Sequence, residues 1–194
     1  MKALFLTGPH AVVKSYGVKK LQENGRLENT LIIDTGPLIR SLHKKMAPNQ
    51  SFGSWIQDIE AQYGPNITNY LLVQEITLMV QQSNVENLII IGYRTFEGIG
   101  YFLDTMKISD YKVLYIDSSI DTLYVNYLAR EKYITKEDFT AYIAQEQASG
   151  LGNLRQMALN NTDNFEYFYK ENNYVSFDPI VLKFFSRERQ YNRG

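Results

Sequence analysis

The segment Thr7-Gly8-Pro9-His10-Ala11-Val12-Val13-Lys14-Ser15-Tyr16 constrains the fold more than any other part of the chain. It follows the phosphate-binding pattern G-x-x-x-x-G-K-[ST] except that Val13 replaces the second glycine. In such a loop, backbone N–H groups surround a polyphosphate at a helix N-terminus, where the helix dipole also favours negative charge. Residues 8–16 are therefore predicted to form a phosphate-binding loop in which Lys14 reaches the terminal phosphates and Ser15 touches a magnesium ion.

Val13 is the weak point of this match. A β-branched residue does not easily adopt positive φ, and its side chain would stand where the backbone should meet the ligand. Two alternatives follow: the loop has another shape, or its phosphate site is weakened. We expect the valine to be tolerated only if the backbone at this position avoids positive φ.

The sequence around the loop supports the phosphate-loop interpretation. The apolar run 1–6 has the length of a strand, and residues 14–24 have the pattern of a helix that ends at Gly25. A second apolar run, 30–33, is typical of a buried parallel strand that follows a crossover helix. Strand, loop, helix and strand thus occur in the order that a phosphate loop requires.

The rest of the chain alternates between segments with the hydrophobic spacing of a helix and short apolar runs typical of strands. Further strands are predicted at 87–91, 112–116 and, more weakly, 174–177, and helices at 54–63, 67–83, 121–132 and from Thr135 to about 148. The last of these helices opens with a capping-box signature, Thr135 to Asp138. This alternation predicts an α/β fold of three layers, α/β/α, with a mostly parallel five-stranded sheet and one domain over residues 1–194.

Composition narrows the classes of function. The 194 residues carry a net charge of −1, so no global field favours nucleic acid or an anionic membrane, and any phosphate chemistry must be local. The chain has no cysteine and only two histidines, which excludes disulfides, thiol nucleophiles and cysteine metal sites. No stretch reaches membrane-spanning length, so we expect a soluble, cytoplasmic protein.

Polar residues follow the second and third predicted strands. Asp34 and Thr35 come directly after 30–33, with Arg40 further along, and Arg94 follows 87–91. In one interpretation Asp34 accepts hydrogen bonds from a small substrate while the arginines bind its phosphate. In the other, Asp34 or Thr35 caps a helix and both arginines face solvent. The third strand ends at Ile91, where a metal-binding aspartate is common, which leaves magnesium binding in doubt.

A mobile lid is predicted at about 121–150. Arg130, Lys132 and Arg155 are candidates for neutralising charge on a transferring phosphoryl group. The alternative for Arg130 and Lys132 is an ordinary charged helix end. His10 lies inside the loop, where its ring would contact a phosphate or block the pocket.

Together these segments resemble the nucleoside and nucleotide monophosphate kinases among the phosphate-loop proteins, the group of adenylate, cytidylate and dephospho-coenzyme A kinases. The run 34–40, Asp-Thr-Gly-Pro-Leu-Ile-Arg, is similar to the acceptor-monophosphate motif of cytidylate kinases. The run 90–102 resembles a segment of archaeal adenylate-kinase-like proteins. This chain departs from the family at Val13 and Ile91, and in the lid at Leu123 and Asn126 where arginines are common.

The resemblance implies a donor site at residues 8–16, an acceptor site at Asp34, Thr35, Arg40 and Arg94 within a segment that continues over about 40–83, and catalytic roles for Lys14 and Arg130. It implies ATP and Mg²⁺ as cofactors and a small-molecule nucleotide as partner, with no nucleic acid or membrane partner expected and homodimer formation left open. Two readings remain: a phosphotransferase acting on a nucleoside monophosphate or similar phosphorylated acceptor, and a kinase-like nucleotide-binding or interaction module with little turnover.

Overall fold

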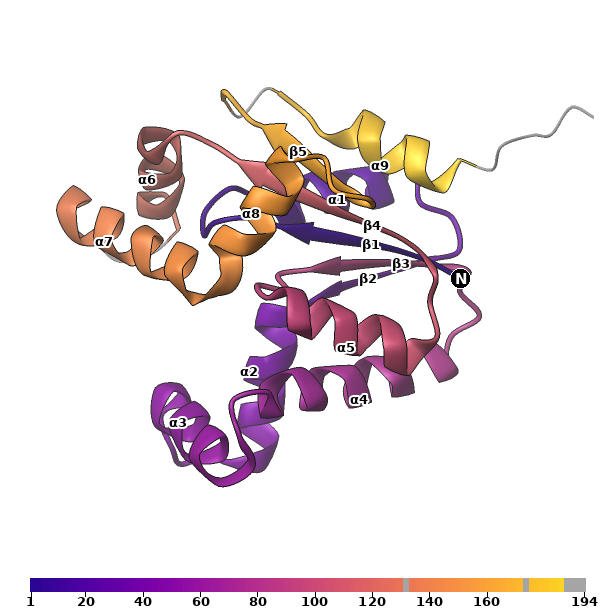
Figure 1. Ribbon diagram of the computed structural model, residues 1–194. Coiled ribbons are helices and arrows are strands. Elements are labelled where there is room, and N and C mark those ends of the chain that lie inside the picture. The colour runs from indigo at the N-terminus through magenta and orange to yellow at the C-terminus, as the bar shows by residue number, and fades with distance from the viewer. Residues whose placement is uncertain (131–132, 173–174, 187–194) are drawn as a thin grey trace, which may run out of the picture.

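A computed structural model describes residues 1–130, 133–172 and 175–186. Over these residues the chain forms a parallel sheet with helices on both faces (Figure 1). The strands are β1 (Lys2–Thr7), β2 (Thr30–Asp34), β3 (Asn87–Ile91), β4 (Asp110–Asp117) and β5 (Phe165–Tyr169). Their spatial order is β2-β3-β1-β4-β5, and every neighbouring pair is parallel. The predicted α/β fold with a five-stranded parallel sheet is confirmed.

Helices connect successive strands, and those predicted from the sequence, found as α1, α3, α4, α6 and α7, begin close to the predicted positions. They are α1 (Lys14–Glu23), α2 (Thr35–Met46), α3 (Phe52–Tyr63), α4 (Ile67–Gln81), α5 (Phe96–Met106), α6 (Ile120–Leu128), α7 (Lys136–Glu146), α8 (Gly152–Leu159) and α9 (Asp178–Phe185), with a π-helical segment η1 (Gln147–Leu151) between α7 and α8. The predicted cap of α7 is confirmed, because the Thr135 side chain accepts a hydrogen bond from the Asp138 N–H.

The core has two halves, one on each face of the sheet. Alternate residues of β1 point to opposite faces: Ala3 and Phe5 pack with α4, α5 and α8, whereas Leu4 and Leu6 pack with α1, α6, α7 and α9. Since both faces are covered, the central strands are apolar throughout instead of alternating with polar residues.

The fifth strand differs from the prediction. It lies at Phe165–Tyr169, whereas the predicted strand at 174–177 is wrong for Val175–Phe177, which form no strand; Tyr174 lies outside the described residues. The polar residue in β5 is Glu166, whose carboxylate accepts from the Lys112 ammonium at 2.6 Å on the adjacent strand β4. Phe177 is buried for another reason, because it packs against Gly17 of α1 and the Phe168 ring.

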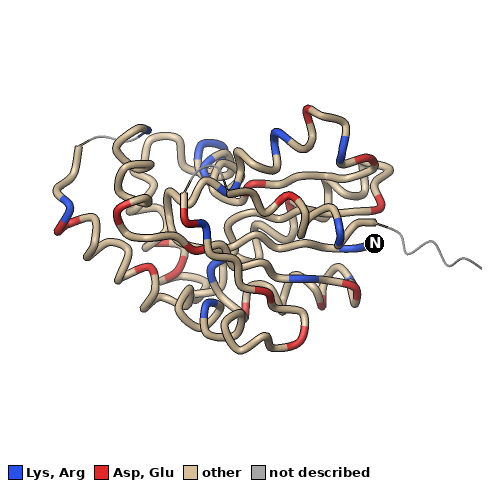
Figure 2. The backbone as a smooth tube through the Cα atoms, turned by 90° about the horizontal axis from the view of Figure 1, so that it is seen from above, with Lys and Arg blue, Asp and Glu red and all other residues tan. Residues whose placement is uncertain are grey.

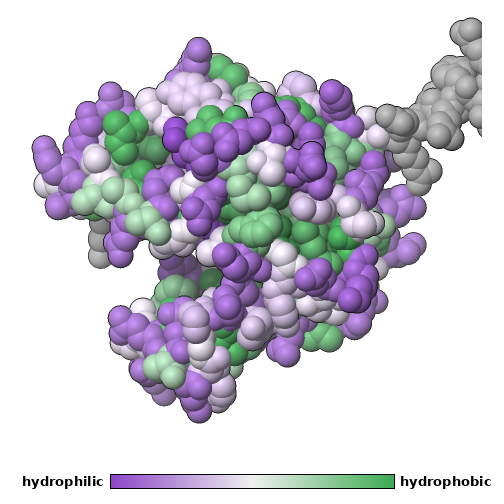
Figure 3. Space-filling model, in the orientation of Figure 1, coloured by the Kyte–Doolittle hydropathy of each residue, from purple (hydrophilic) through white to green (hydrophobic). Residues whose placement is uncertain are grey.

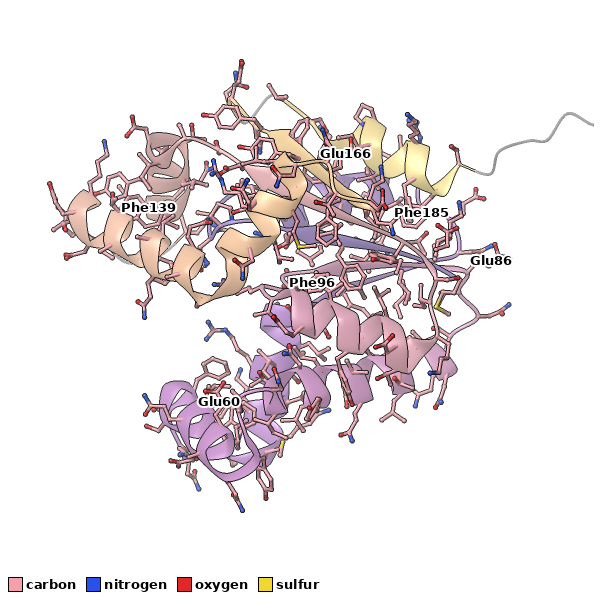
Figure 4. The ribbon with its side chains drawn as sticks, in the orientation of Figure 1. Glu60, Glu86, Phe96, Phe139, Glu166 and Phe185 are labelled. Atoms are coloured by element: carbon pink, nitrogen blue, oxygen red, sulfur yellow. The ribbon has the colours of Figure 1, made fainter. Side chains whose placement is uncertain are left out.

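Two helical lobes extend beyond the carboxyl ends of the strands. Figure 1 shows α2 and α3 in one lobe and α6 and α7 in the other, both at the end of the sheet toward which the arrows point. The first lobe has a small core of its own, around Leu42, Trp55 and Ile59. In the second, Phe139 lies between the two helices, as Figure 4 shows, and is fully buried. The space-filling view in Figure 3 is hollowed between the lobes, which places an open cleft at this edge of the sheet.

Charged residues of both signs are interspersed along the described chain. Figure 2 shows Lys and Arg mixed with Asp and Glu from end to end, with no single-signed face in that view. This distribution agrees with the net charge of −1. Electrostatic attraction to an anionic ligand must therefore arise from local groups.

Candidate functional site

The loop between β1 and α1 lies at the carboxyl edge of the sheet, at the same end as the two lobes. β1 ends at Thr7 and α1 begins at Lys14, as predicted. Three residues of the loop have positive φ: Gly8 at 135°, Ala11 at 64° and Val13 at 64°. A left-handed residue placed between residues of other conformation turns successive backbone N–H groups to one side, which makes an anion-binding concavity.

The condition stated for Val13, a backbone that avoids positive φ, is not met. Val13 is the residue before α1 and adopts the left-handed conformation, with φ 64° and ψ 45°. A non-glycine residue in this region costs about 1–3 kcal/mol and persists only where the surroundings impose it. Here Val12 is anchored in the core at 1% exposure, and the Asn126 side chain donates to the Ala11 carbonyl at 3.1 Å. The loop shape is thus held by its neighbours and not by glycine at each turn.

Replacing Val13 by glycine is expected to raise the free energy of unfolding by about 1 kcal/mol. The gain comes from relief of the left-handed backbone strain, and it is reduced by the larger backbone entropy that glycine loses on folding. Little packing is lost, because the Val13 side chain is only partly buried and belongs to no core cluster. Urea denaturation measures the change. Val12→Gly is the matched control and should lower stability by about 2 kcal/mol or more, since it removes a core side chain. A loss of stability in Val13→Gly would contradict the strain argument.

Lys14 lies at the start of α1 and folds back over the loop. Its Nζ donates to the carbonyl oxygens of Gly8 at 2.9 Å and Pro9 at 3.0 Å. Burial, and then the nearby Arg94 charge, lower the pKa of Lys14 to about 8, while Glu146 and Asp34 oppose the shift. An anion close to Nζ would raise this pKa again, so the lysine gains charge when it gains an anionic partner.

The next residue, Ser15, joins the loop to the second strand. Its Oγ donates to Asp34 Oδ2 at 2.6 Å, and Asp34 Oδ1 accepts from the Gly36 N–H at 3.1 Å. Asp34 therefore caps α2, as one of the two interpretations predicted, and also faces the phosphate loop. A hydroxyl and a carboxylate side by side are ligands that suit Mg²⁺, which commonly takes one or two carboxylates in addition to substrate phosphates. The sequence pattern predicted each group but not their contact.

The other predicted acceptor residues are divided. The Thr35 hydroxyl is buried and donates to the Ile91 carbonyl at 3.0 Å, which ties α2 to β3. Arg40 stacks on the Phe52 ring in the α2–α3 lobe, with its guanidinium carbon 4.9 Å from the ring centre. Tyr16, at the end of the predicted loop, is 68% exposed. Arg40 is the charged residue of these three, and its guanidinium lies in the α2–α3 lobe, which borders the cleft.

Arg94 is exposed, with 46% of its side chain accessible, but its charge is not free of partners. Its guanidinium forms an ion pair with Glu146, the last residue of α7, and Glu146 also accepts from the His10 N–H at 2.9 Å and the Tyr142 hydroxyl at 2.9 Å. Glu146 is only 4% exposed. This glutamate was not predicted as a site residue. The sequence does contain a signal for it, because Phe139, Ile143 and Glu146 fall on one face of a helix, so that a charged residue interrupts an apolar stripe.

His10 lies between the loop and the α6–α7 lobe. Its ring contacts the rings of Tyr127 and Tyr142, with centres 5.7 and 5.9 Å away. Burial lowers the pKa of His10 below its usual value, with smaller contributions from Glu146, which opposes the shift, and from Arg130, Lys14 and Arg94. The imidazole is therefore neutral near pH 7.

The candidate lid arginines have different surroundings. Arg130 is exposed in the turn after α6, and its charge contributes to lowering the pKa of both Lys14 and His10. Arg155 lies on α8, outside the α6–α7 lobe, where its Nε donates to Asp117 Oδ2 at 2.7 Å. Arg155 is thus held at the sheet and not in a lid. Lys132 lies outside the described residues.

The site therefore collects a loop with left-handed turns, Lys14, the exposed Arg94 and Arg130, and a hydroxyl–carboxylate pair. Among the described residues, no three His, Asp or Glu side chains gather as a metal cluster, so any Mg²⁺ here would depend on ligand phosphates for part of its coordination. Nor does any helix in the described part of the chain have the length and apolar character to cross a membrane.

A parallel sheet in the order β2-β3-β1-β4-β5, with a loop of this shape after β1, defines a phosphate-loop kinase-like fold. The structure of the Deinococcus radiodurans tunicamycin resistance protein is similar, with a TM-score of 0.55 over 94% of this chain and 92% of that chain. The two sequences are 9% identical, so the likeness concerns the fold. No protein-family model and no curated protein matches the sequence.

Proposed function

We propose that the protein binds ATP in the loop of residues 8–16 and transfers its γ-phosphoryl group to a small acceptor held near Asp34, of which a nucleoside monophosphate is the first candidate. The observation that carries the proposal is the meeting of Lys14, Ser15 and Asp34 at a loop whose backbone keeps left-handed turns without glycine at Ala11 and Val13. A strained backbone at a site is itself a reason to infer function there.

In this function the chain's own residues act by position and charge. Backbone N–H groups of the loop hold the donor phosphates, Lys14 turns from the Gly8 and Pro9 carbonyls toward them, and Arg130 approaches from the lid. Ser15 and Asp34 would hold Mg²⁺, which when bound supplies charge neutralisation at the phosphates. Arg40 would hold the acceptor, and Arg94, once released from Glu146, would bind phosphate between the acceptor and the loop.

A second function is favoured by the partners of the arginines. Arg94 is already paired with Glu146, Arg40 is stacked on Phe52, and β3 ends at Ile91 and not at a carboxylate. Each charged group that cannot contact the transferring phosphoryl group raises the free energy of the transition state by on the order of several kcal/mol. On this alternative the protein binds a nucleotide and turns it over little or not at all.

Purified protein with Mg-ATP and a panel of acceptors distinguishes the two. The panel contains nucleoside monophosphates and, because the structural neighbour is a tunicamycin resistance protein, tunicamycin. We expect ADP and a phosphorylated acceptor from one member of the panel, and at least about 100-fold less product from Lys14→Ala. Lys20→Ala, an exposed lysine on the same helix, should behave like the wild type. ATP binding without turnover of any acceptor supports the second function. If neither the wild type nor the loop variants bind ATP, both functions are excluded.

A further inference from the structure

Glu146 is a buried carboxylate on the apolar face of the α7 helix. It shares that face with Phe139 and Ile143, which pack into the core, and it is 4% exposed. A carboxylate loses its hydration on burial, which is costly unless charged or hydrogen-bonding groups replace the water. The groups that replace water here are therefore informative.

These groups are the kinds that bind phosphate. Oε2 accepts from the loop N–H of His10, and Oε1 accepts from Arg94 and from the Tyr142 hydroxyl. A backbone N–H of an anion-binding loop, a guanidinium and a hydroxyl are the donors with which proteins hold phosphate oxygens. The Glu146 charge also acts on Lys14, whose pKa it raises against the effect of burial. Glu146 is thus an anion that the chain itself supplies to its phosphate loop.

The backbone after Glu146 fixes this carboxylate in place. α7 runs into the segment η1, where the backbone kinks: Ser149 and Gly150 have non-helical dihedral angles, with φ 113° at Gly150. A Cβ at Gly150 would lie 2.9 Å from Thr95 Cγ2 and 3.1 Å from the Arg94 carbonyl oxygen, so the close approach of η1 to the Arg94 segment requires glycine.

We propose that Glu146 is an internal competitor of phosphate, so that a polyphosphate binds the loop only by taking the His10 N–H and Arg94 from it. This inference rests on the proposed phosphate-binding function. A Glu146 that lost both partners while still buried would be an uncompensated charge, which is strongly unfavourable. Phosphate binding is therefore coupled to displacement of the C-terminal end of α7 from the loop.

Isothermal titration calorimetry with Mg-ATP and with inorganic tripolyphosphate tests the coupling. Glu146→Gln keeps the size of the side chain and removes its charge, and it should lower the Kd for both ligands by about tenfold. Tyr142→Phe keeps the charge, removes one donor to it and should lower both values by roughly threefold, which provides a second test if Glu146→Gln fails to fold. Glu137→Gln, an exposed glutamate on the same helix, is the matched control and should change neither.

The outcomes separate this inference from the function on which it rests. Tighter binding by both variants supports the competitor, and so does binding by Glu146→Gln alone where the wild type binds nothing. Wild-type binding that both variants leave unchanged or weaken overturns the competitor while the phosphate site stands. Adenosine, which carries no phosphate, should gain no affinity; an equal gain for adenosine also overturns the competitor. Failure of every protein to bind either ligand overturns both proposals.

Discussion

Replacing Asp34 by asparagine is expected to lower kcat/KM for Mg-ATP-dependent phosphoryl transfer by at least about 100-fold while leaving the fold intact. Asparagine caps helices as well as aspartate does, so the bond from the Gly36 N–H to the cap of α2 survives. Its amide oxygen takes the place of Oδ1 at that cap, and its NH2 group, in the place of Oδ2, can donate to Ser15 Oγ in reverse direction. The substitution therefore removes the carboxylate charge and little else.

Two measurements accompany the kinetics. Urea denaturation should place Asp34→Asn within about 0.5 kcal/mol of the wild type, because cap and hydrogen bond remain. Raising the Mg²⁺ concentration should recover part of the lost activity if Asp34 acts as a metal ligand. Asp58→Asn, an exposed aspartate of the α3 helix outside the loop region, is the control and should retain full activity. Full activity in Asp34→Asn would exclude the carboxylate from the reaction and favour the capping role alone.

The sequence predicted the framework of the site well because its signals are local. Strand, loop and helix follow one another within residues 2–23, and the α7 cap is a four-residue motif, so periodicity and spacing are sufficient to place them. β5 was misplaced because Phe165–Tyr169 carries a glutamate whose partner, Lys112, comes from the adjacent strand. A strand stabilised by a cross-strand pair is not recognisable from its own residues.

The contacts within the site could not be predicted from the sequence. The Ser15–Asp34 bond joins the first turn of α1 to the end of β2, and Glu146 meets His10 across 136 positions of the chain. The positive φ of Val13 could not be predicted for a similar reason. Positive φ at a valine is unfavourable when considered locally, but Asn126 and the buried Val12 hold the neighbouring backbone, and tertiary contacts of this kind override a local preference.

Replacing Gly8 by alanine is expected to lower the free energy of unfolding by about 3 kcal/mol or more. A Cβ on Gly8 would lie 2.0 Å from the backbone carbonyl oxygen of Ile116 in β4, and φ at this position is 135°. The obstacle is backbone within the sheet, which cannot rotate away as a side chain would. Gly25→Ala separates the two causes, because Gly25 also has positive φ, 66°, but has open space around it. It should cost about 1 kcal/mol.

The comparison bears on what the motif means. If Gly8→Ala is far more costly than Gly25→Ala, then close packing against Ile116 is sufficient reason for the first glycine of the motif, whether or not phosphate binds. Equal costs would instead assign the whole penalty to φ. Evidence for a phosphate site then falls on the residues that packing does not require: Lys14, whose ammonium is held over the loop, and the exposed pair of Ser15 with Asp34. These are the side chains whose substitution should separate binding and turnover from folding.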